Sequence, residues 1–349
     1  MLQKLRIINF RSIETMDLYF EKINNIIWNN GAWKTNILQA ILCLFQSNHS
    51  LGSQEILKNG TNHIFIEWVF TQNDGLENKL TFSYDAQNDK KLVLLNGKKV
   101  TKKVLHENIL HISYFSPISM NLFYLGPKYR RDFLDDILKS TFWEYDTLLK
   151  NYEKILKHRN KILKNIAEEK SKIDEIYFWN NEFIKSAVTI YEYRKQINQF
   201  LKENIKSNSD VFQHNFANIE YIYTSKVDMN RIGESIKEYL EKNLQRDIIL
   251  GKTHIWPHID DFDIRINEKS LVDFASRWEI KSIIINLKLQ EINFIHSITK
   301  KLPIVLIDDL SSELDSEHSK LVLEKLWHLQ IIFTSILALN SEEISTIQI

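Results

Sequence analysis

The stretch Val305-Leu306-Ile307-Asp308-Asp309, followed by Ser312-Glu313-Leu314-Asp315, decides the fold of this chain. Its apolar half is typical of a strand that is buried on both faces, as in the parallel sheets of α/β proteins. Two carboxylates directly after such a strand are costly to bury unless they meet a cation or hydrogen-bond donors. The first can hold Mg²⁺ through water, and the second can orient an attacking water. We therefore predict that Asp308 and Asp309 are catalytic residues of a phosphoryl-transfer site.

A second segment, near the N-terminus, has part of a phosphate-binding loop. Such a loop needs a strand, a glycine-rich turn, and Lys-Ser/Thr at the start of a helix, so that backbone N–H groups surround the phosphates. Here a predicted strand, residues 22–28, leads into Trp28-Asn29-Asn30-Gly31-Ala32-Trp33-Lys34-Thr35. Lys34 and Thr35 fit the pattern, but tryptophan stands at both required glycines. Taken alone, the segment is equally well explained as an ordinary helix start.

The composition is that of an ordinary globular protein, with 44% hydrophobic and 26% charged residues. A single cysteine, Cys43, fits a reducing compartment. We find no signal peptide and no apolar run of the roughly 18 residues that a membrane span needs, so a cytoplasmic location is expected. The 45 basic residues equal the 45 acidic ones, so any nucleic-acid contact requires a local basic face.

The pattern of expected strands and helices along the chain predicts three parts. Residues 1–117 mix strands with a helix and a β-meander, and residues 250–349 return to that mixed pattern. Between them, residues 118–249 predict a helical insertion, because apolar residues recur at helical spacing and residues 130–203 contain neither proline nor glycine. Basic residues are dense on this insertion. A solvated helical face and a DNA-binding face are equal alternatives there, and the candidates for DNA contact are Lys128, Arg130, Arg131, Lys157 and Arg159.

Six segments, in the same order along the chain, resemble motifs of the RecF family, which are bacterial recombination-repair ATPases of the ABC/SMC kind. The resemblance covers nearly the full length, and Thr334-Ser335 also falls where the family has paired threonines after its last core strand. The six segments are Asn9-Phe10-Arg11-Ser12, Arg130-Arg131-Asp132-Phe133-Leu134-Asp135, Tyr152 through Leu156-Lys157 to Arg159-Asn160, Gly251 through Asp261, Phe274 through Lys281, and Asp308 through Asp315.

The resemblance implies an α/β fold, namely an ABC-type P-loop ATPase head with an inserted all-helical domain. It implies a dimer that forms on ATP, with Mg²⁺, and that binds single-stranded and gapped double-stranded DNA. It further implies help in loading RecA at gaps with RecO and RecR, and a part in the SOS response. Thr35 and Asp308 would hold the metal. The residues implied to contact ATP are Arg11, Trp28, Asn29, Asn30, Gly31, Ala32, Trp33, Lys34, Thr35, Ser276 and Trp278.

Tryptophan stands at four positions where the family has glycine: Trp28, Trp33, Trp256 and Trp278, with Trp68 considered as a fifth. The chain has only 8 glycines and as many as 8 tryptophans, whereas ordinary proteins contain about 7% glycine. Glycine lets the backbone adopt positive φ and approach phosphate closely. Tryptophan in the loop and at the signature is therefore expected to damage the ATP site.

Two explanations of these tryptophans stay open. Decay into a non-hydrolysing pseudo-ATPase is the first, but decay should scatter over several residue types. The second is that UGA codons meaning glycine in the source were read as tryptophan, a hypothesis that UGG codons at these positions would exclude. The chain is then a slow DNA-dependent ATPase if the positions are glycine. Otherwise it is a pseudo-ATPase that serves as a DNA-binding or scaffold protein. Another ABC-type head, SMC- or Rad50-like, is disfavoured, because the helical arm at about residues 130–203 is too short for the long coiled coil of those proteins.

Overall fold

The computed structural model describes residues 1–27, 33–45, 56–72, 75–108, 111–206, 218–255, 257, 259–310, 316–336 and 343–348. The chain forms two compact units. The head unit consists of residues 1–120 and 291–349, and the arm unit of residues 121–290. The boundaries expected from the sequence, 118 and 249 for the inserted part, stay a prediction; the arm unit continues to residue 290.

The first sheet of the head unit has five parallel strands in the order β14-β3-β13-β12-β8. All four residues of β12 are buried, as expected for a strand covered on both faces. Because the strands are parallel, their carboxyl ends meet at one edge of the sheet, where ligands bind in open α/β sheets. The strands are β3 (Ile23–Ile27), β8 (Ile112–Phe115), β12 (Ile304–Ile307), β13 (Ile331–Ser335) and β14 (Ser345–Gln348).

The second sheet of the head unit is antiparallel, in the order β2-β1-β4-β5-β6-β7. Its last turn is Asn96-Gly97, where both residues have positive φ, as a two-residue hairpin requires. The short strand β2 was not among the sequence predictions, although its residues alternate and pair with β1. The strands are β1 (Leu2–Phe10), β2 (Ile13–Tyr19), β4 (His63–Thr71), β5 (Glu77–Asp85), β6 (Lys90–Leu95) and β7 (Lys98–Lys99).

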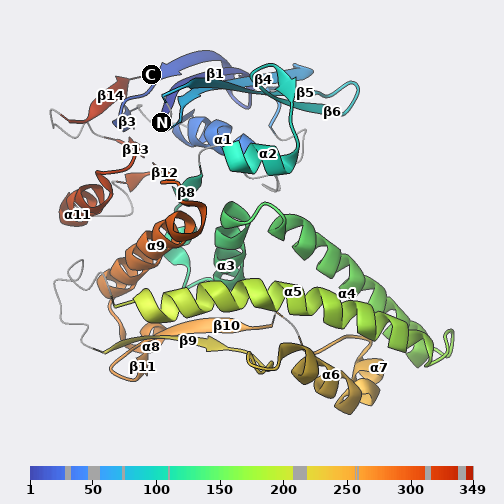
Figure 1. Ribbon diagram of the computed structural model, residues 1–349. Helices are drawn as coiled ribbons and strands as arrows, with labels where there is room; N and C mark the ends of the chain where they lie inside the picture. The colour runs from blue at the N-terminus through green and yellow to red at the C-terminus, as the bar shows by residue number, and fades with distance from the viewer. Residues whose placement is uncertain are drawn as a thin grey trace. The chain divides into compact units, whose positions relative to one another are not determined.

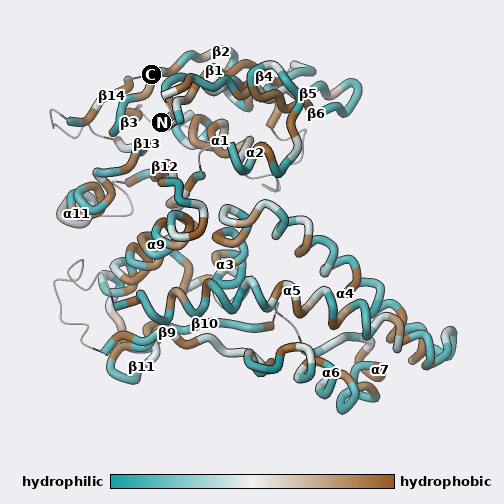
Figure 2. The backbone as a smooth tube through the Cα atoms, in the orientation of Figure 1, coloured by the Kyte–Doolittle hydropathy of each residue, from teal (hydrophilic) through white to brown (hydrophobic). Residues whose placement is uncertain are grey.

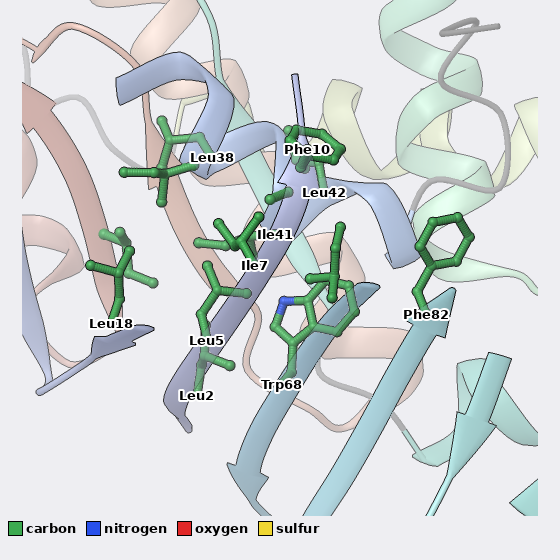
Figure 3. Packing of buried hydrophobic residues seen from close by; sticks show 14 of the residues in the cluster. Leu2, Leu5, Ile7, Phe10, Leu18, Leu38, Ile41, Leu42, Trp68 and Phe82 are labelled. Atoms are coloured by element: carbon green, nitrogen blue, oxygen red, sulfur yellow. The ribbon is translucent and has the colours of Figure 1, made fainter. Parts of the chain in front are cut away.

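Helix α1 (Trp33–Phe45) shares one hydrophobic core with both of these sheets. Figure 3 shows Leu38, Ile41 and Leu42 of α1 among side chains of the antiparallel sheet. Trp68 on β4 is only 1% exposed and lies in this core beside Leu5. Glycine there would leave a large apolar void, so this indole has a packing role in the fold. The head unit also contains α2 (Lys102–Asn108), the short turn η1 (Ser119–Asn121) and α11 (Ser316–Leu326).

The arm unit combines helices with a three-stranded antiparallel sheet in the order β11-β10-β9. Helices α4 and α5 pack along each other (Figure 1). Strand β9 falls inside the insertion that was predicted to be helical throughout. No helix in the described ranges is both long and apolar enough to cross a bilayer. The elements are α3 (Pro127–Thr141), α4 (Tyr145–Ala167), α5 (Glu175–Asn204), β9 (Ile219–Thr224), α6 (Ile232–Lys242), α7 (Leu244–Leu250), β10 (Asp261–Ile266), β11 (Lys269–Ser270), α8 (Leu271–Phe274) and α9 (Arg277–Thr299), which runs on into the head unit.

Candidate nucleotide-binding site

Asp308 lies directly after β12, at the carboxyl edge of the parallel sheet, and is 7% exposed. Its carboxylate accepts hydrogen bonds from three hydroxyl groups. The Thr35 hydroxyl lies 3.2 and 3.1 Å from the two carboxylate oxygens, that of Thr334 lies 3.1 Å from Oδ1, and that of Tyr114 lies 3.2 Å from Oδ2. Within the described ranges no cationic side chain pairs with it. A buried carboxylate with only neutral donors is a favourable place for a metal cation.

Lys34 and Thr35 stand in the first turn of α1, which follows β3. The Lys34 ammonium donates to the Ser335 carbonyl oxygen at 3.2 Å, and the Ser335 hydroxyl donates to Asn25 at 2.8 Å. This places the Lys34 side chain over the ends of β13 and β3. A lysine in this position can meet phosphate oxygens at the same edge where Asp308 lies.

The turn before α1 carries five of the residues that the sequence assigns to ATP: Trp28, Asn29, Asn30, Gly31 and Ala32. They lie outside the described residues, as does Ser312-Glu313-Leu314-Asp315. Trp33 is described as the first residue of α1, and its half-buried side chain packs against the head core.

Asp309 follows Asp308 with a left-handed backbone, at φ of 56°. Its N–H donates to the Thr334 hydroxyl at 2.7 Å. Non-glycine residues adopt this conformation rarely, and such strain clusters at functional sites. The second carboxylate is thereby turned away from the line of β12 and stays half-buried, which suits a residue that meets water and substrate.

Tyr114, on β8, was not predicted from the sequence. Burial, and then the neighbouring Asp308 carboxylate, raise the pKa of its hydroxyl well above the ordinary value, so the group stays protonated and donates. A signal existed in principle, because Tyr114 is a hydroxyl-bearing residue near the end of a predicted core strand. The sequence alone does not say that β8 lies beside β12.

Arg11, in the turn between β1 and β2, also has positive φ, at 50°. Its guanidinium donates through Nη1 to the Asn36 side-chain oxygen at 3.2 Å, and Asn36 donates to the Ser12 hydroxyl at 2.8 Å. Its Nε is buried without a hydrogen-bond partner among the described residues. A buried donor left without an acceptor is rare. The structure therefore brings Arg11 to the first turns of α1 with donor capacity left for an anion.

Ser276 and Trp278 belong to the arm unit, at the start of α9. The Ser276 N–H and hydroxyl both donate to one Glu279 carboxylate oxygen, at 2.7 and 2.8 Å, and the Glu279 N–H donates to the Ser276 hydroxyl at 3.3 Å. This is a capping box, in which a helix satisfies its own first N–H groups. Glu279, which stands where the family has glutamine, therefore accepts the hydrogen bonds that the signature residue Ser276 could otherwise donate to a nucleotide.

The five residues predicted to contact DNA are all in the arm unit, but they differ in exposure and in their partners. Lys128 and Lys157 are exposed. Arg130 is bound by the Asp261 carboxylate at 2.8 and 2.7 Å, and Arg131 donates to the Asp260 carbonyl oxygen at 3.1 Å. Arg159 is 0% exposed, so its guanidinium presents no face to a DNA phosphate.

Arg159 instead holds several segments of the arm unit together. Its guanidinium meets the Asp247 carboxylate at 3.1 Å, the Asn180 side-chain oxygen at 2.8 Å and the Thr253 hydroxyl. These groups come from α4, α5, α7 and the segment after α7. A buried arginine with this many partners stabilises the fold, and Arg159 is therefore not a DNA contact in the function proposed below.

The chain matches no protein-family model. It is 30% identical over 340 residues to the DNA replication and repair protein RecF of Ruminiclostridium cellulolyticum, covering 93% of this chain and 90% of the relative. It is likewise 30% identical over 342 residues to the protein of the same name from a Thermoanaerobacter species, covering 95% of this chain and 93% of the relative.

Two solved structures of the recombination mediator protein RecF in the RecFOR pathway resemble the whole chain. The one with ATPrS has a TM-score of 0.87 at 26% identity, covering 100% of this chain and 96% of that one. The one with ATP has a TM-score of 0.83 at 26% identity, covering 98% and 93%. These likenesses confirm the predicted fold class, an ABC-type α/β ATPase head with an inserted helical part.

Proposed function

This chain belongs to the RecF family of DNA replication and repair proteins, and on that premise we propose that it binds DNA in an ATP-dependent way during recombinational repair. In this proposal it dimerises on ATP and binds single-stranded and gapped double-stranded DNA. It then helps to load RecA at gaps together with RecR and RecO, as part of the SOS response. The observation that carries the proposal is the buried Asp308 carboxylate, whose side-chain partners among the described residues are the hydroxyl groups of Thr35, Tyr114 and Thr334.

The residues at this edge fit Mg²⁺ and a nucleotide phosphate. Asp308 offers hard oxygen ligands without a competing protein cation, and the Thr35 hydroxyl already touches both of its oxygens. Among the described residues, the Lys34 ammonium donates to a neutral carbonyl oxygen, which leaves its charge for a phosphate. The buried Nε of Arg11 lacks an acceptor among the described residues. ATP would supply acceptors to both cations.

In the mechanism we propose, Lys34 binds β- and γ-phosphate oxygens while Thr35 and Asp308 hold the metal. When bound there, Mg²⁺ would supply positive charge that offsets the charge of the phosphate oxygens. Asp309 would accept a hydrogen bond from the attacking water and so orient it toward the γ-phosphate. Tyr114 and Thr334 would keep the Asp308 carboxylate in one orientation while the Thr35 hydroxyl turns away from it. Hydrolysis, where it occurs, would be slow and would release the dimer, so that ATP acts as a timer.

A substitution at the metal-binding carboxylate tests this proposal. Asp308→Asn is compared with Asp89→Asn, because Asp89 also accepts a tyrosine hydroxyl, that of Tyr84 at 3.1 Å, but lies in the turn between β5 and β6. We expect the wild type and Asp89→Asn to gain thermal stability with ATP and Mg²⁺ and to hold duplex DNA more tightly. Asp308→Asn should show neither gain. Equal responses from all three proteins would overturn the proposed ATP site.

A second candidate is a pseudo-ATPase that binds DNA or acts as a scaffold. Two observations favour it: tryptophan at signature position 278, and the Glu279 carboxylate that holds Ser276. Both oppose contact between this signature and the γ-phosphate of a second subunit. This candidate predicts DNA binding that neither ATP nor Asp308→Ala changes.

Peptide mass spectrometry of the protein from its own cells distinguishes the two candidates, because it identifies the residue at each of the four tryptophan positions. Glycine at positions 28, 33, 256 and 278 would restore a complete loop and signature and support the ATP-dependent protein. Tryptophan at all four would exclude the codon hypothesis and favour the pseudo-ATPase.

A further inference from the structure

One face of α4 carries four lysines in phase: Lys154, Lys157, Lys161 and Lys164. Their spacing of three, four and three residues places them within an arc of about 80° and over about 15 Å of helix length. All four are exposed. Along α4 in Figure 2, hydrophilic and hydrophobic stretches alternate as an amphipathic helix requires. We call these four residues the α4 lysine stripe.

The opposite face of α4 holds the helix in the arm unit. Tyr152, Arg159 and Leu163 are 2%, 0% and 0% exposed, and their spacing of seven and four residues also defines one face. Tyr152 contacts Phe183 of α5, and Leu163 packs in a cluster with Ile176. The stripe therefore lies on the face of α4 opposite these buried residues and is exposed, although the side-chain stem of Lys164 lies against Gly251 at the end of α7.

The positive charge of the stripe is compensated only in part by acidic residues of the described chain. At its start, Lys150 is paired with Asp146 at 3.1 Å, and after its end Lys170 is paired with Glu168 at 2.6 Å. Among the residues that the structure describes, none of the four stripe lysines forms an ion pair. Two acidic residues still act on the stripe: Glu153 precedes Lys157 by four positions, and the pKa of Glu168 is lowered by Lys170 first and also by Lys164. Successive stripe lysines are i,i+3 and i,i+4 neighbours, and like charges at such spacings destabilise a helix. A solvated helix usually mixes both signs instead, so helix stability does not explain the stripe.

We propose that the α4 lysine stripe binds the phosphate backbone of double-stranded DNA. This inference rests on the proposed function and says which surface of the arm unit would serve it. Duplex DNA presents a regular row of phosphates, and lysines on one straight helix face meet such a row without reading bases. Proteins that hold single strands usually add aromatic side chains on which bases stack. Among the exposed aromatic residues of α4 and α5, Tyr177 and Phe178 lie on α5, and the ring of His158, beside the stripe, is already stacked on Trp179.

The test compares two full-length variants that each lose four positive charges. The stripe variant carries Lys→Gln at positions 154, 157, 161 and 164. The control variant carries Lys90→Gln, Lys91→Gln, Lys98→Gln and Lys99→Gln, which removes four exposed lysines from the β6–β7 hairpin of the head unit. Fluorescence anisotropy with a duplex of about 30 base pairs gives Kd over a range of salt concentrations, with and without ATP and Mg²⁺, and a single strand of the same length is measured in parallel.

We expect the stripe variant to bind duplex DNA about 10- to 100-fold more weakly near physiological salt, and its log–log salt slope to fall by about 3 to 4. The control variant should stay close to the wild type. The thermal midpoint of the stripe variant should not fall, because the change relieves like-charge contacts. Equal loss in both variants, loss in neither, or loss confined to the single strand would overturn the stripe as a duplex site. If the wild type itself binds no DNA, the DNA part of the proposed function fails together with the stripe.

Discussion

Two buried carboxylates of the arm unit and one of the head unit have opposite kinds of partner. In the arm unit, Asp247 is paired with Arg159 at 3.1 Å and Asp135 with Arg194 at 2.8 Å. In the head unit, Asp308 receives three hydroxyl groups and, within the described ranges, no cation. Charge that serves the fold is thus neutralised within the chain. Charge that is left uncompensated at a sheet edge favours a cation supplied from outside, and for this reason we propose Asp308 as the centre of the candidate site.

The largest effect is expected where compensation is removed. Arg159→Gln removes the guanidinium from the fully buried Asp247 carboxylate, which keeps the His254 ring nitrogen at 3.1 Å as a partner. The loss of this ion pair should lower the free energy of unfolding by about 3–5 kcal/mol. Lys157→Gln, two residues away on the same helix but exposed, should change it by less than about 0.5 kcal/mol. Urea unfolding followed by circular dichroism measures both. A loss below about 1 kcal/mol for Arg159→Gln would contradict the structural role given to this pair.

A smaller effect is expected at the uncompensated site. Tyr114→Phe removes one of the three donors to Asp308 and little else, so the fold should be nearly unchanged. One hydrogen bond to a charged group contributes about 1.5–3 kcal/mol, and part of that should appear as a rise of about ten-fold in the Mg²⁺ concentration that half-saturates ATP binding. Tyr84→Phe is the matched control, because its hydroxyl meets the carboxylate of Asp89. Equal Mg²⁺ requirements in the two variants would show that Tyr114 does not position Asp308.

The sequence predicted the strand and the helix start of the head site, but not all of the side chains that contact Asp308. The apolar strand before Asp308 and the Lys34-Thr35 helix start are local patterns, and the structure brings their side chains together as the resemblance implied. The role of Tyr114 depends on the sheet order, in which β8 lies beside β12. Strand order is set by long-range packing, so no local pattern reveals it.

The arm unit shows a different gap between sequence and structure. Arg159 and Lys157 look alike in a count of basic residues, yet one is 0% exposed and the other is exposed. The helical phase separates them: Arg159 follows Tyr152 by seven residues and precedes Leu163 by four, which places it on the apolar face. That signal was available from the sequence. The identity of its partner, Asp247 on α7, was not, because the two residues are 88 positions apart.

The smallest expected effect comes from Asp260, a buried carboxylate of the arm unit that, like Asp308, accepts a tyrosine hydroxyl. Tyr223 donates to it at 2.8 Å, and burial raises the pKa of the Asp260 carboxyl. A raised pKa means that the folded state binds the proton more tightly than the unfolded state does. Its contribution to stability is therefore full below the unfolded pKa of about 3.9 and is lost as pH rises through the folded pKa.

Asp260→Asn removes this titration and keeps an acceptor for Tyr223. We therefore subtract the unfolding free energy of Asp260→Asn from that of the wild type. This difference should decrease between about pH 4 and neutral pH, by about 1 kcal/mol or less. Taking the difference at each pH cancels the other titrating groups. A difference that stays flat or rises with pH would mean that neutral donors, aided by nearby Arg194, already stabilise a buried carboxylate. Asp308 would then need no metal to be stable, and the absence of a cationic partner would no longer indicate a functional site there.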